Sequence, residues 1–167
     1  MSRRRRSNFS FTWTLREHGW ALCAVTDDEA RAEVAVSSVT SGPEQLLAAV
    51  TQLVLGAVAS RAEFEAEPTV YRWFFQRKET DVGIRLLEAA DRRMPDDAGE
   101  LIWCGRQTVT TLARTIVRAF DSVVDELGQV GYESRWGRPF PARELAALRA
   151  AWRTGRSLPA VVTDHAT

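Results

Sequence analysis

Apolar and polar residues alternate in the first part of the chain in a way that is typical of β-strands. In residues 9–15 every second position is apolar, which gives one buried face. A turn at His18-Gly19 leads to residues 20–26, which are apolar on both faces. Residues 32–38 alternate again after a cluster of acidic turn residues at 27–29. The pattern predicts three consecutive strands.

The pattern then changes to that of a helix. Ser41 is followed by Pro43 and by Glu44, and this order is typical of a capped helix start. The apolar residues that follow predict a helix over residues 43–59. Residues 61–68 are rich in charge and are interpreted as a connector.

The second part of the chain repeats this order. Three more strands are predicted, at residues 69–78, 81–88 and 100–106, and the apolar residues of 81–88 alternate on one face. One apolar stripe predicts a helix over residues 110–127, which Gly128 would end. Residues 129–140 are expected to form a loop, and residues 142–153 a last helix.

Two strand-strand-strand-helix units predict an α+β two-layer sandwich. Short turns make neighbouring strands antiparallel, so we expect one sheet of about six strands, with two helices on one face and a third, C-terminal helix. The folded domain would span residues 9–153, between a disordered basic arm at 1–8 and a mobile tail at 154–167.

A short string shared by the two halves suggests an internal duplication. The order aromatic-x-Trp-x-apolar occurs at residues 11–15 and again at 71–75. It allows a pseudo-repeat of residues 9–60 and 69–128. The alternative is that the strings are alike only because strands favour aromatic residues.

Composition narrows the classes of function. The chain has 167 residues, of which 45% are hydrophobic, and its 22 basic and 22 acidic residues cancel. These values exclude a disordered chain and argue against a protein whose main partner is nucleic acid, which needs a basic footprint. No apolar stretch is long enough for a signal core or a membrane span, so we expect a cytoplasmic protein.

No residue pattern indicates an active site. Cys23 and Cys104 lack metal-binding spacing and are expected to be buried thiols, with a disulfide as the alternative. His18, with Glu17 beside it, is interpreted as a solvated turn residue instead of a general base. Glycine-rich phosphate loops and hydrolase motifs are absent from the sequence. We therefore predict no catalytic, metal-binding or cofactor-binding residues.

Two predicted elements carry more apolar surface than a two-layer domain needs. The strand at residues 69–78 is apolar on both faces, and the helix at 43–59 is apolar around most of its circumference. The helix at 142–153 or a second copy of the chain could cover them. The leading hypothesis is a non-catalytic, cytoplasmic protein-binding or regulatory domain that acts as a homodimer or binds another protein.

The predicted partner or ligand surface lies on the strands at residues 69–78 and 81–88. It consists of Tyr71, Arg72, Trp73, Phe74 and Arg85. Two alternatives stay open. The first is an enzyme or small-molecule binder whose pocket, between sheet and helices, has Arg72 or Arg85 to hold an anion. Its walls would be Trp13, Tyr71, Trp73 and Trp103. The second is a weak nucleic-acid binder that uses the arginines at 3–6 and the strand at 69–78.

Overall fold

The computed structural model describes residues 8–157, which form seven strands and three helices in an α+β fold. In chain order these are β1 (Ser10–Leu15), β2 (Trp20–Thr26), β3 (Arg31–Ser37), α1 (Gly42–Val54), β4 (Ala59–Glu65), β5 (Val70–Lys78), β6 (Asp81–Ala89), β7 (Glu100–Thr108), α2 (Val109–Trp136) and α3 (Ala142–Ser157). Within the described chain, no helix has the length and apolar character needed to cross a membrane.

The strands form two antiparallel sheets, so the predicted single six-stranded sheet is wrong in detail. Sheet A has the order β1-β2-β3, and sheet B has the order β4-β5-β6-β7. The strands of each sheet are neighbours in the sequence and antiparallel, as the short turns predicted. The chain leaves sheet A through α1 and starts sheet B with an additional strand, β4.

Sequence reasoning missed β4 because its outer face is charged. Residues 59–65 alternate, with Ala62 and Phe64 buried and with Arg61, Glu63 and Glu65 on the other face. The helix predicted over residues 43–59 ends earlier, at Val54, and the predicted charged connector is mostly this strand. Only two core residues mark the strand, so its charges concealed the alternation.

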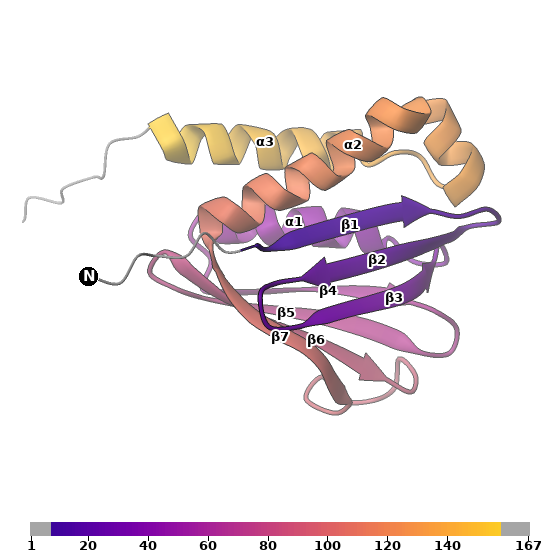
Figure 1. Ribbon diagram of the computed structural model, residues 1–167, viewed down its shortest axis with the longest axis horizontal. Coiled ribbons are helices and arrows are strands. Elements are labelled where there is room, and N and C mark those ends of the chain that lie inside the picture. The colour runs from indigo at the N-terminus through magenta and orange to yellow at the C-terminus, as the bar shows by residue number, and fades with distance from the viewer. Residues whose placement is uncertain (1–7, 158–167) are drawn as a thin grey trace, which may run out of the picture.

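The inner faces of the two sheets pack against each other and against the helices (Figure 1). Aromatic rings join the sheets, with Phe11 of sheet A 6.0 Å from Trp73 of sheet B and Trp13 5.7 Å from Phe64, measured between ring centroids. Trp13 also contacts Trp136 of α2, at 5.0 Å. The core is therefore shared by both sheets and α2.

Helix α3 covers α1, as one of the sequence hypotheses proposed. Both helices bury side chains in the same core, with Leu46 and Leu53 from α1 and with Leu145 and Leu148 from α3. The start of α1 lies so close to β4 that a Cβ at Gly42 would clash with the ring of Phe64. The apolar circumference of this helix is thus buried within one chain.

Helix α2 continues beyond the residue that was predicted to end it. Gly128 leaves the helical conformation, with φ 69° and ψ 167°, and the chain then resumes a helix up to Trp136. Tyr132 and Trp136, four residues apart, are fully buried and hold this last segment on the core. The predicted loop at 129–140 is therefore largely helical. Similarly, α3 extends to Ser157, so the first residues of the predicted tail are helical.

The structure tests only part of the remaining sequence predictions about the chain's organisation. The basic arm at 1–8 and the rest of the tail at 158–167 lie almost wholly outside the described residues. The shared aromatic strings occupy β1, the first strand of sheet A, and β5, the second strand of sheet B. Internal duplication stays a prediction.

We expect Trp13→Ala to lower the free energy of unfolding by about 3–5 kcal/mol, because it removes a large side chain from the place where three elements meet. Thr12→Ala is the control, since Thr12 is the exposed neighbour on the same strand and should change stability by less than about 0.5 kcal/mol. Urea denaturation followed by far-ultraviolet circular dichroism measures both. Equal losses for the two variants would contradict this account of the core.

Candidate functional site

A row of four side chains crosses the outer face of sheet B. Arg61 on β4 is opposite Phe74 on β5, and Phe74 is opposite Arg85 on β6. Arg85 is in turn opposite Cys104 on β7. Because neighbours in register lie on the same face of a sheet, all four point away from the core. The guanidinium carbons of Arg61 and Arg85 each lie 5.4 Å from the centre of the Phe74 ring, which is typical of cation–π contacts.

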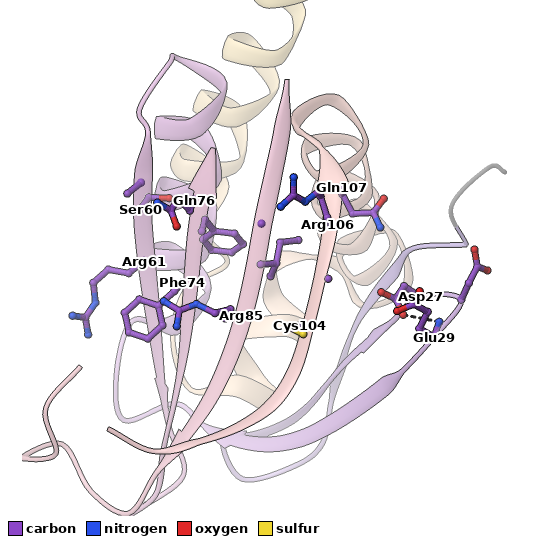
Figure 2. A pocket seen from close by; sticks show the side chains of 16 residues that line it. Asp27, Glu29, Ser60, Arg61, Phe74, Gln76, Arg85, Cys104, Arg106 and Gln107 are labelled. Carbon is purple, nitrogen blue, oxygen red and sulfur yellow. Dashed lines mark hydrogen bonds between the residues drawn. The ribbon is translucent and has the colours of Figure 1, made fainter. Parts of the chain in front are cut away.

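The row lies in a broad hollow of about 1000 Å³ (Figure 2). Beside the row are Gln76, Gly83 and Arg106, also in register across β5, β6 and β7. Gly83 has no side chain, and a Cβ placed there would have only the Gln76 carbonyl oxygen, at 3.7 Å, as a neighbour. The floor of the hollow is therefore low at its centre, between arginines. We call this surface, formed by Arg61, Phe74, Gln76, Gly83, Arg85, Cys104 and Arg106, the open face.

The other end of the same sheet face is covered by the chain itself. The loop at residues 90–99 folds over it, and the buried guanidinium of Arg72 donates hydrogen bonds to the carbonyl oxygens of Pro95 (2.9 Å) and Arg92 (3.2 Å). Arg72 also donates to the Glu63 carboxylate at 3.0 Å. A buried cation with three such partners holds a loop in place. This loop covers one end of the outer face of β5, whereas Phe74, nearer the other end, lies on the open face.

Two arginines of the outer face are paired with carboxylates and two are not. Arg61 forms ion pairs with Asp96 and with Glu63, and its hydrogen bond to Asp96 lowers the pKa of that carboxyl. For Arg85 and Arg106 no carboxylate of the described residues lies within 4.0 Å, although both are exposed on the floor of the hollow.

An acidic turn forms one rim of the hollow. Asp27, Asp28 and Glu29, between β2 and β3, line the hollow, and Asp27 and Glu29 lie beyond the edge of β7 (Figure 2). The Asp27 carboxylate accepts hydrogen bonds from the backbone N–H groups of Glu29 (2.9 Å) and Ala30 (2.8 Å), as the turn composition predicted. The hollow therefore combines a cationic floor with an acidic rim.

The structure brings together only part of the predicted surface. Phe74 and Arg85 lie on the open face, whereas Arg72 is buried beneath the 90–99 loop. Trp73 points into the core, where its ring stacks on Phe75 at 6.3 Å. Tyr71 is also on the inner side, and burial, followed by the nearby Glu88 carboxylate, raises its pKa.

The pocket expected between sheet and helices is differently composed. Trp73 and Trp103 are core residues, with Trp103 donating to the Ala30 carbonyl oxygen at 3.2 Å. Trp13 borders a smaller hollow of about 410 Å³ between β1 and α2, which also includes Arg118 and Glu126. None of the other expected wall residues lines that hollow.

The cysteines differ from each other. Cys23 is buried as predicted, and burial strongly raises the pKa of its thiol. Cys104 is exposed, so the prediction of a second buried thiol is wrong: its position in β7 has the parity of the outer face. Both thiols are free. His18 is a solvated turn residue, as predicted, 3.9 Å from the Glu17 carboxylate.

The predicted partner surface did not include five residues of the open face, Arg61, Gln76, Gly83, Cys104 and Arg106, or the acidic turn at 27–29 on its rim. Arg61 belongs to the strand that was missed. Arg106 was recognised as part of a strand. Whether it lies on the same face as Arg85, however, depends on how β6 and β7 pair, and this pairing includes a register shift between Leu86 and Leu87. Among the residues that the structure describes, no group of three or more His, Cys, Asp or Glu side chains could hold a metal ion.

Comparisons with known proteins add little to this geometry. No family model matches the chain, and no curated protein matches it. A solved structure that does match is described as a "CdiA-CT/CdiI toxin and immunity complex from Enterobacter cloacae". The TM-score is 0.46 with 7% sequence identity, over 67% of this chain and 99% of that chain. A likeness at this level supports no conclusion about function.

We expect one thiol to react with Ellman's reagent in the native protein and both to react after denaturation, because only Cys104 is exposed. Cys104→Ser should abolish the native reaction and leave one thiol in the denatured protein. The absorbance of the released thiolate measures the number. Two reactive thiols in the native protein would mean that Cys23 is accessible, and none would mean that Cys104 is buried. Either result would contradict the placement of the two cysteines.

Proposed function

We propose that this protein is a non-catalytic protein-binding domain and that the open face of sheet B is its binding surface. The observation that carries the proposal is the pair of exposed arginines, Arg85 and Arg106, without a carboxylate partner in the described chain. Elsewhere on the same face Arg61 and Arg72 are neutralised by Asp96 and Glu63. A partner would supply the missing anions.

The shape of the hollow supports a protein partner over a small molecule. Small-molecule sites bury most of the ligand surface in a concave, mainly apolar pocket. This hollow spreads across four strands, and Arg61, Gln76, Arg85, Cys104 and Arg106 on its floor are all exposed. Phe74 is a half-buried aromatic residue of its floor, between Arg61 and Arg85, and aromatic residues are enriched in protein interfaces.

The homodimer and the cytoplasmic location stay predictions from the sequence. Most of the apolar surface that motivated the homodimer is covered within one chain, by α3 and by the 90–99 loop, although Phe74 stays on the open face. A dimer would therefore have to use other exposed apolar side chains, such as Leu55 and Val58 between α1 and β4.

Site-specific cross-linking tests the binding surface. A benzophenone attached to Cys104 of the purified protein, illuminated in an extract of the source cells, should cross-link a defined protein that mass spectrometry identifies. Phe74→Ala should reduce the yield of that product at least about tenfold, since a few side chains usually contribute most of the affinity of an interface.

Two further label positions make the cross-linking result interpretable. Thr12→Cys in a Cys104→Ser background places the label on the solvent face of sheet A, where no product is expected. Gln76→Cys, also in that background, repeats the experiment on the open face without a bulky group at position 104. The same products from both sheets, or no product from either open-face position, would refute the proposal.

For the homodimer, size-exclusion chromatography with light scattering at micromolar concentration should give twice the 18.7 kDa mass of one chain. A mass of one chain would exclude it without affecting the protein-binding proposal.

A further inference from the structure

The spacing of the two unpaired arginines defines what the open face can bind. Arg85 is in register with Cys104, and Arg106 is two residues further along β7 on the same face. Such diagonal neighbours in an antiparallel pair are about 7–8 Å apart between Cα atoms. Arg106 is opposite Gly83, so no side chain from that position of β6 lies beside Arg106.

The spacing of these two Cα atoms is close to that of alternate residues in an extended chain. A β-strand rises about 3.3 Å per residue, and residues i and i+2 therefore lie about 6.6 Å apart on one face. Two carboxylates at these positions could each meet one guanidinium. Resting on the proposed function, we infer that the partner supplies an extended segment with acidic residues at positions i and i+2, bound by Arg85 and Arg106.

One of the two arginines is held in place before binding. The guanidinium of Arg85 lies over the Phe74 ring, whose other neighbour in register, Arg61, is fixed by its ion pairs with Asp96 and Glu63. Because the Arg85 side chain is already ordered, less conformational entropy is lost when it binds a carboxylate. The two arginines of the pair can then form charge-assisted hydrogen bonds to the partner.

The acidic groups around the hollow restrict the partner to a short acidic segment. Asp28 and Glu29 lie on the rim, and Asp81 is next to Arg106 on the same face of the sheet, although no ion pair forms between them. These carboxylates repel a long polyanion such as nucleic acid, whereas two acidic residues centred on the arginine pair avoid them. Like-charge repulsion is a usual source of specificity.

Fluorescence anisotropy with synthetic peptides tests the inference. The probe is a fluorescein-labelled peptide of nine residues, the length of β7, built from Thr and Val with two Glu at positions i and i+2. Matched peptides carry the two Glu at i and i+1, which point to opposite sides of an extended chain, or carry two Gln. We expect the i, i+2 peptide to bind at least about fivefold more tightly than either matched peptide.

Two charge-reversed proteins locate the binding. R85E/R106E should weaken binding of the i, i+2 peptide at least about tenfold. R114E/R118E changes the net charge equally on the exposed side of α2 and should change binding less than about twofold. R85Q/R106Q repeats the test without charge reversal, and circular dichroism checks that each variant is folded.

Equal losses in the two charge-reversed proteins, or equal binding of all three peptides, would overturn the inference. So would tighter binding of a single-stranded oligonucleotide than of the i, i+2 peptide. A cross-linked partner whose yield falls with Phe74→Ala but not with R85E/R106E would retain the proposed function and refute the acidic segment. Absence of any cross-linked partner, together with absence of peptide binding, would refute both.

Discussion

Trp13 is the point at which the elements of this protein are joined. Its ring contacts Phe64 of β4, and it contacts Phe120 and Trp136 from the two helical parts of α2. These contacts hold sheet A, sheet B and α2 around one core. They also account for the return to a helix after Gly128, because a helix places Trp136 over Trp13 while burying Tyr132 one turn earlier.

Packing both sheets on this core leaves sheet B with one face toward the interior and one face outside. The two ends of the outer face differ in how their arginines are paired and covered. At one end Arg72 is buried, paired with Glu63, and covered by the 90–99 loop. At the other end Arg85 and Arg106 are exposed and have no carboxylate partner in the described residues. A surface whose charges are only half neutralised is suited to binding an anionic group from another molecule.

The fold was more predictable than the site. Period-two alternation identified β1, β3 and β6, because apolar residues at every second position form one face of a strand but are spread around a helix. Short, largely apolar runs next to turn residues indicated β2 and β5. In β4 only Ala62 and Phe64 carry that signal, and three charged residues conceal it. Of the predicted surface, Phe74 and Arg85 are on the open face. Arg72 and Trp73 are buried, since one is covered by a distant loop and the other faces sheet A.

The sequence by itself determined the α+β class, the antiparallel pairing of neighbouring strands and the apolar character of the interior, all of which follow from local periodicity and short turns. Only the tertiary structure decided that the strands divide into two sheets, that α3 and not a second chain covers α1, and that Cys104 is exposed while Cys23 is buried. These outcomes depend on contacts between residues far apart in the sequence. The position of Arg106 beside Arg85 has the same origin, because cross-strand register follows from the pairing of whole strands and not from the spacing of residues along one of them.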